Sequence, residues 1–239
     1  MARTAHDATS FFKNIDRTFT ALDDKLEKSV KEHLRNVYGT LAMGLGAAAF
    51  GAAVHLFTDI LRANFLLTLG SIGLMFMLIS TPATLENQMK RFGYFFGFCF
   101  ISGVSTGPLL EQVIRINPSI IFTALMATVF VFGAFTLAAL HAPSTKYLYL
   151  GGTLASASLG LLCLALFSNF YNVILWGGLA VSCGFILYDT QLIVEKNRRG
   201  DQDFIWHAVE LFIDFAQVFR YLLVLLSQKE KRDERRRRD

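Results

Sequence analysis

Four polar side chains recur at helical spacing within the last apolar stretch of the chain, residues 204–226. They are His207, Glu210, Asp214 and Gln217. At about 100° of rotation per residue, they fall within an arc of about 80° on one face of a helix. Ionisable groups at bilayer depth are costly and normally face a protein interior or a water-filled cavity. The stripe therefore predicts a membrane helix that other helices enclose.

Asp189 supplies a second carboxylate near the end of the preceding apolar stretch, in the segment FILYDTQLIVEK. It lies about six residues before the predicted end of its helix, and Asp214 lies about ten residues into the next helix. At a rise of about 1.5 Å per residue, the two depths below the shared surface are about 9 Å and about 15 Å. Two antiparallel neighbouring helices can therefore bring Asp189 and Asp214 into contact.

Two carboxylates in a desolvated site cannot both ionise cheaply, so a facing pair shares one proton. Such a pair is a natural sensor of pH near neutrality, and its deprotonated oxygens are hard ligands for Ca²⁺. His207 and Glu210 lie on the same stripe, nearer the cytoplasmic end, and are predicted to extend a polar ion path. In the alternative interpretation, these groups only hydrogen-bond the bundle together.

The composition places the chain in the membrane class. Hydrophobic residues make up 53% and charged residues 18% of the 239 residues, and the mean hydropathy is +0.42, whereas soluble domains hold about 25% charged residues. The net charge of +4 comes largely from the terminal segments. Because no basic-aromatic motif accompanies this charge, membrane topology explains it better than a nucleic-acid partner does.

The predicted fold is an all-α integral membrane protein, a seven-helix bundle with the C-terminal helix central. The expected spans are the apolar runs at 37–57, 61–80, 92–110, 119–140, 147–168, 173–194 and 204–226. Together they form one membrane domain over residues 37–226. Residues 1–36 are predicted to be a cytoplasmic arm with an amphipathic helix. The apolar face of that helix is formed by Phe12, Ile15, Phe19, Leu22 and Leu26.

Lys and Arg residues favour a cytoplasmic N-terminus. The N-terminal arm and the second, fourth and sixth gaps carry 13 of them, whereas the other three gaps carry two, as the positive-inside rule requires. Residues 227–239 form a basic tail with seven more. Full crossing of the last segment places this tail on the opposite side, and re-entry returns it to the cytoplasm. Segment length favours crossing, whereas charge bias favours re-entry.

Several residues outside the acidic stripe receive accessory roles. Pro108 and Pro118 are predicted to mark helix ends, because proline blocks continuation of a helix. Glu111, between them, is interpreted as a loop carboxylate or as part of a pore mouth. Arg220 lies near the end of the last span, where a long side chain can snorkel to the interface. The tail arginines are predicted to bind anionic lipid or an acidic partner. They are Arg235, Arg236, Arg237 and Arg238.

Four segments carry a resemblance to a known family. FILYDTQLIVEK, GDQDFIWHAVELFIDFAQVFR, STPATLE and the GPLLE–INPSI stretch closely resemble the Bax inhibitor-1 family, also called the transmembrane Bax inhibitor motif family. The resemblance covers the chain from about His33 to Leu226. In that family a pair of aspartates on the last two helices forms a pH sensor, and the matching positions here are Asp189 and Asp214. Bacterial relatives add an arginine at the end of the second helix as a partner of this pair. This chain reads LISTPATLE there and has no arginine. Its nearest basic residues, Lys90 and Arg91, lie further along and are poor substitutes.

The resemblance implies a multi-pass protein of the endoplasmic reticulum membrane that acts as a pH-sensitive Ca²⁺ leak and restrains cell death and stress signalling. It implies Bcl-2-type apoptosis regulators and stress-sensor proteins of the endoplasmic reticulum as partners, beside the lipid bilayer. No cofactor is expected, because Ca²⁺ is the transported ion. We expect acid to increase the leak, whereas competition between H⁺ and Ca²⁺ for the carboxylates would oppose this.

Three other functions are weighed against the leak. A membrane scaffold would bind apoptosis and stress-signalling proteins without transport. An intramembrane aspartyl protease would also use two aspartates, and Tyr188-Asp189 resembles its first motif, but its GxGD motif is missing. The third is a hydrolase, because the segment 103–107 matches G-x-S-x-G, the nucleophile elbow. That motif requires a strand-turn-helix, whereas the segment lies in an apolar helical run. We therefore expect a protein that is not an enzyme.

Overall fold

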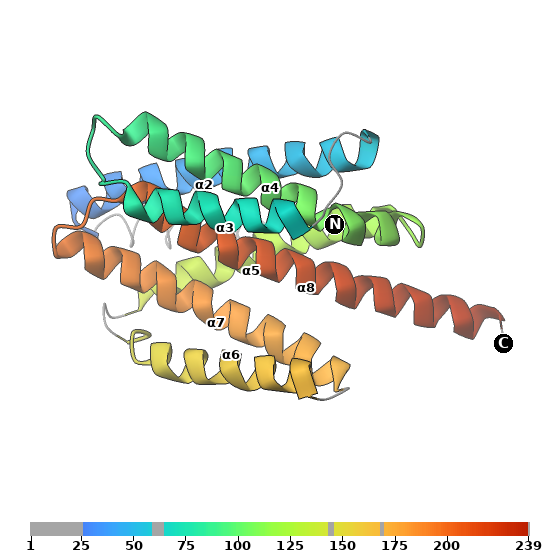
Figure 1. Ribbon diagram of the computed structural model, residues 1–239. Helices are drawn as coiled ribbons and strands as arrows, with labels where there is room; N and C mark the ends of the chain where they lie inside the picture. The colour runs from blue at the N-terminus through green and yellow to red at the C-terminus, as the bar shows by residue number, and fades with distance from the viewer. Residues whose placement is uncertain (1–25, 59–64, 143–145, 168–169, 239) are drawn as a thin grey trace, which may run out of the picture.

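The computed structural model describes residues 26–58, 65–142, 146–167 and 170–238, and all regular structure within these ranges is helical (Figure 1). The helices are α2 (Lys28–Phe57), α3 (Phe65–Ser80), α4 (Gln88–Ile114), α5 (Ser119–His141), α6 (Leu150–Phe167), α7 (Tyr171–Arg198) and α8 (Phe204–Arg238). Each coincides with one of the seven predicted apolar runs, although α3 and α6 cover only part of the runs 61–80 and 147–168. The all-helical fold and the number of membrane-domain helices are therefore confirmed for the described residues. The apolar positions 12–22 of the predicted arm lie outside them.

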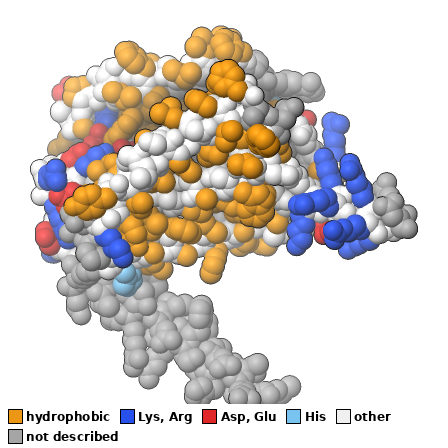
Figure 2. Space-filling view, turned by 90° about the horizontal axis from the view of Figure 1, so that it is seen from below, with side chains coloured by type: hydrophobic (Ala, Val, Ile, Leu, Met, Phe, Trp, Pro, Cys, Tyr) orange, Lys and Arg blue, Asp and Glu red, His pale blue; other side chains and the backbone are white. Residues whose placement is uncertain are grey.

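Length and composition identify the membrane-crossing helices. By these criteria five described helices can cross a membrane, namely α2, α4, α5, α6 and α7, while α3 is apolar but has only 16 residues. Large apolar side chains such as Phe76, Phe130 and Leu162 are exposed on the outside of the bundle. The face in Figure 2 shows a broad hydrophobic band between charged groups at the two ends. This distribution is the one expected for a protein surrounded by lipid.

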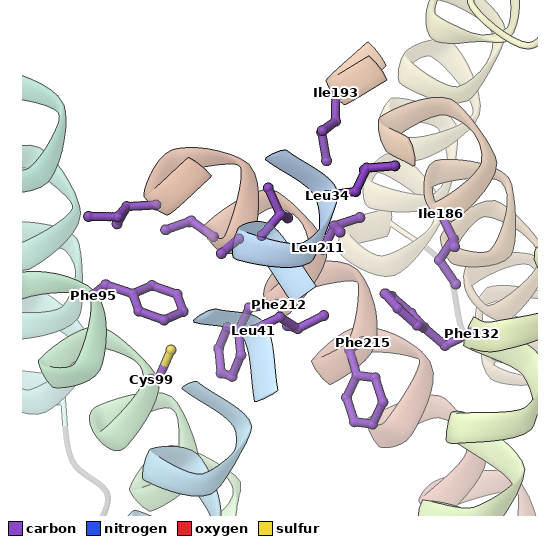
Figure 3. Close-up of a cluster of buried hydrophobic side chains, with 14 of the residues drawn as sticks. Leu34, Leu41, Phe95, Cys99, Phe132, Ile186, Ile193, Leu211, Phe212 and Phe215 are labelled. Atoms are coloured by element: carbon purple, nitrogen blue, oxygen red, sulfur yellow. The ribbon is translucent and has the colours of Figure 1, made fainter. Parts of the chain in front are cut away.

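The last helix, α8, provides much of the buried core. It packs against α2, α4, α5 and α7. The ring of Phe212 meets Phe95 of α4 edge-on with centroids 6.3 Å apart, and Phe215 meets Phe132 of α5 at 5.5 Å. Figure 3 shows these rings in one apolar cluster with Leu41 of α2. That α8 is the central helix of the bundle stays a prediction.

The helix α8 also shows the course of the last apolar segment through the bundle. It runs without interruption over 35 residues, which at about 1.5 Å per residue is about 52 Å, longer than the roughly 30 Å hydrocarbon core. Its C-terminus therefore lies at the opposite end of the bundle from the α7–α8 connection (Figure 1). The described part of α8 thus does not turn back, whereas the side of the membrane on which the tail lies stays a prediction. Lys and Arg side chains cluster on the projecting end (Figure 2).

The prediction that Pro108 ends a helix is wrong. The helix α4 continues through Pro108 to Ile114, so Glu111 lies in its last turn and not in a loop. Proline removes one N–H from the helical ladder, but a membrane helix tolerates this loss where neighbouring groups pack around it. Pro118 does mark a boundary, because it is the N-cap residue of α5.

Glycines allow α2 and α4 to cross in direct backbone contact. A Cβ atom on Gly51 would lie 2.1 Å from the carbonyl oxygen of Phe100, and one on Gly103 would lie 1.9 Å from that of Ala48. Gly103 begins the G-x-S-x-G match, and the whole match lies inside helix α4. The segment therefore serves close helix packing, as small residues do in membranes, and is no nucleophile elbow.

Replacement of Gly103 by alanine should loosen the α2–α4 crossing. The added methyl group overlaps a backbone oxygen that cannot rotate away, and overpacking of this kind costs about 1–3 kcal/mol. We expect a lower apparent melting temperature of the detergent-purified protein. Gly133→Ala is the matched control, since its new Cβ atom meets nothing within 4 Å. Equal melting temperatures for the two variants would contradict the assigned contact.

Candidate functional site

The structure brings the two predicted aspartates together. The side chains of Asp189 on α7 and Asp214 on α8 lie close enough to interact and line the same cavity. Asp214 is buried and Asp189 is half-buried. A hydrogen bond between two carboxyl groups needs a donor, so it can form here only when the pair carries a proton. This contact arises because α7 and α8 pack side by side in opposite directions (Figure 1).

Glu210 lies one helical turn before Asp214 and is held from two sides. Its Oε1 accepts hydrogen bonds from Lys196 Nζ and from Trp206 Nε1, each at 2.9 Å. The charges of both Glu210 and Lys196 act on Asp189. The acidic cluster therefore contains one compensating cation, which the sequence analysis had used only for topology. A signal was present, because Lys196 follows Asp189 by seven residues and so occupies the same face of α7.

A cavity of about 540 Å³ lies beside these carboxylates, between α6, α7 and α8. Asp189, Glu210, Asp214 and Gln217 all line it. Three of the four stripe residues of α8 thus share one cavity. Ionisable groups in membrane helices typically face such a space.

His207 does not join this cavity. Its imidazole is fully buried, with Nδ1 2.8 Å from Nε2 of His33 on α2 and Nε2 3.7 Å from Oδ2 of Asp201. A neutral imidazole has one donor and one acceptor nitrogen, so the two rings share a single N–H···N bond. The sequence analysis missed His33, because no pattern along the chain fixes the register of α2 against α8.

Arg91 belongs to a third cluster at this end of the bundle. Its guanidinium donates to both carboxylate oxygens of Asp203, at 2.7 and 2.5 Å, and the side chain is buried. Asp203 Oδ1 also accepts the backbone N–H of Trp206 at 3.1 Å, as an N-cap residue does. Arg91 therefore ties the start of α4 to the start of α8 and does not partner the aspartate pair.

The accessory residues lie away from the acidic cavity. Glu111 Oε1 is 3.2 Å from His55 Nε2, at the other end of the bundle. The snorkelling prediction for Arg220 is wrong, since its guanidinium turns sideways to α4 and donates to Thr106 and Ser102. The tail residues Arg235, Arg236 and Arg237 are exposed on the last turns of α8. The side chain of Arg238 lies outside the described part of the chain.

Comparison with known proteins places this arrangement in a family. The sequence model described as "Bax1-I: Inhibitor of apoptosis-promoting Bax1" matches residues 30–231. Bax inhibitor 1 of Homo sapiens is 47% identical over 210 residues, which cover 85% of this chain and 88% of the relative. The Drosophila melanogaster protein is 39% identical over 239 residues, covering 97% of each. The Arabidopsis thaliana protein is 37% identical over 217 residues, covering 87% of this chain and 86% of the relative.

Removal of the Asp203 charge should destabilise the fold through Arg91. Asp203→Asn keeps an acceptor for the α8 cap but leaves a buried guanidinium without its counter-charge, and a broken buried pair costs about 3–5 kcal/mol. We expect a clear fall in the apparent melting temperature. The double variant with Arg91→Met should recover part of it, because no unpaired charge remains. Additive losses in this double-mutant cycle would show that the pair contributes no coupling.

Proposed function

The chain belongs to the family of inhibitors of apoptosis-promoting Bax1, and on that premise we propose that it is a pH-sensitive Ca²⁺ leak channel of the endoplasmic reticulum membrane. Membership of the family implies suppression of apoptosis. The proposal adds a mechanism for this suppression, in which the Asp189–Asp214 pair gates the flow of Ca²⁺ past α8. The close approach of these two carboxyl groups, which line one cavity, is the observation that carries it.

Proton number sets the force between α7 and α8. With one proton on the pair, the carboxyl groups hold the helices together through their hydrogen bond. With none, two unit charges about 4 Å apart repel each other by about 4 kcal/mol at an effective dielectric constant of about 20. That energy is enough to shift a two-state equilibrium about a thousandfold. The pair can therefore act as a gate that responds to pH. By this force loss of the proton, and not acid, separates α7 from α8, which is opposite to the sign expected from the sequence.

The cavity offers a cation several oxygen ligands. Ca²⁺ takes about six to eight oxygens, and Asp189, Asp214, Glu210 and Gln217 present carboxylate and amide oxygens to one space. A Ca²⁺ ion that passes would be bound by these oxygens together with part of its water shell, and H⁺ competes with Ca²⁺ for the same oxygens.

Charge at the two ends of the bundle supports a cytoplasmic N-terminus. The start of α2 and the α3–α4, α5–α6 and α7–α8 connections lie at one end (Figure 1). This end carries basic residues such as Lys90, Lys146 and Lys196, so the positive-inside rule assigns it to the cytoplasm. The continuous α8 then carries the basic tail to the other side of the membrane.

The gate is tested by Ca²⁺ flux into liposomes of known internal pH. Asp189→Asn and Asp214→Asn keep the shape of the pair but remove one titrating group each, so the pH dependence of the flux should flatten in both variants. Asp233→Asn, on the projecting end of α8, is the control and should behave as the wild type. Flux and pH profiles that are unchanged in both pair variants would remove the gate assignment.

A scaffold role is favoured by the basic end of α8, whose arginines project beyond the bundle (Figure 2). Charge alone suits this end to anionic lipid or to an acidic surface. Because the proposed topology places it on the lumenal side, stress-sensor proteins of the endoplasmic reticulum are the proposed partners at this end. Deletion of residues 228–239 separates the two functions. We expect unchanged Ca²⁺ flux in liposomes but loss of protection in stressed cells. A loss of flux in the purified deletion variant would instead tie the tail to the leak.

A further inference from the structure

A second cavity opens on the face of α8 that adjoins the acidic one. It is a groove of about 540 Å³ between α3 and α8, with α4 as its floor. Its lining includes Ile72, Phe76 and Ile79 of α3, which are 61%, 69% and 61% exposed. Since these side chains belong to the lipid-facing surface, the groove is open to the hydrocarbon of the bilayer.

Arg220 places an uncompensated charge in this groove. Its Nη2 donates to Ser102 Oγ at 3.1 Å and to Thr106 Oγ1 at 3.0 Å, and its Nε donates to Thr106 Oγ1 at 3.2 Å. These partners are neutral hydroxyl groups. Among the described residues, no carboxylate forms an ion pair with Arg220 or acts on its charge. A half-buried guanidinium at membrane depth without a counter-charge is costly, so an anion that enters the groove is strongly favoured.

Polarity changes along the groove. The helices α3 and α8 run in opposite directions (Figure 1), so Thr68 at the start of α3 lies toward Arg220, while Ile79 lies toward Phe212. Hydroxyl side chains and the guanidinium thus gather at one end, and apolar side chains occupy the other. The span from Thr68 to Ile79 is about 16 Å at 1.5 Å per residue. One end therefore suits an anionic head and the remainder suits an extended acyl chain.

We infer that this groove binds a long-chain fatty acid, with its carboxylate on the Arg220 guanidinium and its chain between α3 and α8. The orientation agrees with the bilayer. Arg220 precedes Leu226, the last residue of the apolar stretch, by six residues, which is about 9 Å. The head then lies toward the near interface and the chain points to the midplane, as it does for the surrounding lipid.

The depth of Arg220 distinguishes a fatty acid from a phospholipid. A phospholipid head group lies at the interface, whereas a bare carboxylate is small enough to lie about 9 Å inside it when a guanidinium neutralises its charge. The groove also has one apolar channel, which matches one chain. The Nε and Nη2 groups of Arg220 are already used by Thr106 and Ser102, so the carboxylate would accept its charge-assisted hydrogen bond from Nη1.

The binding test uses the full-length protein in nanodiscs of zwitterionic phosphatidylcholine, with radiolabelled palmitate as the probe. Arg220→Gln should weaken binding at least tenfold, because it removes a charge-assisted pair. Met75→Trp should also weaken binding, since it fills the apolar channel and leaves the charge in place. Arg115→Gln, an exposed arginine at the end of α4, is the matched control and should bind as the wild type.

Ligand chemistry gives a second comparison that needs no variant. Hexadecanol has the same chain length as palmitate but no charge, and should bind the wild-type protein at least tenfold more weakly. Equal binding of hexadecanol, or wild-type affinity in Arg220→Gln, would overturn the inference. Displacement of palmitate by phosphatidylserine at a lower concentration would assign the groove to an ordinary bilayer lipid and overturn it as well. Since these measurements use no Ca²⁺, they stand apart from the proposed leak.

Discussion

A helix that carries carboxylates, an imidazole and a guanidinium is stable in a membrane protein only where its neighbours supply partners. In α8 these groups face three different helices. Asp214 meets Asp189 of α7, His207 meets His33 of α2, and Arg220 meets Ser102 and Thr106 of α4. This requirement fixes the rotation of α8 against three neighbours at once, and it accounts for the close packing of the apolar side chains between the polar contacts.

The same requirement explains what could be read from the chain. Hydropathy locates the seven helices because the bilayer imposes a minimum apolar length, and antiparallel order places Asp189 and Asp214 at similar depth. Which face of α8 meets which neighbour depends on side-chain packing between segments far apart in the sequence. His207 therefore looked like part of the acidic stripe although it turns toward α2, and His33 carried no signal at all.

Other differences have equally local causes. Pro108 looks like a helix end in sequence, but α4 continues through it to Ile114, and α4 packs closely against α2 at Gly51 and Gly103. Charge counts suggested that the basic tail returns to the cytoplasm. The structure instead favours helix continuity, because the residues after Leu226 are good helix formers and α8 extends through them to Arg238. Local propensity outweighs the charge bias there.

Two cavities on adjoining faces of α8 share part of their lining. Ile213 and Gln217 contribute to the groove beside α3 and also to the acidic cavity beside α7. An acyl chain that enters the groove must displace these side chains or pack against them. Gln217 is one turn from Asp214 on the same helix. If α8 moves between two positions, a ligand that binds the protein better in one of them shifts the equilibrium toward that position by its differential affinity. The protonation state of the aspartate pair and the contents of the groove would thus act on one shared element, so each would change the apparent affinity for the other by the same factor.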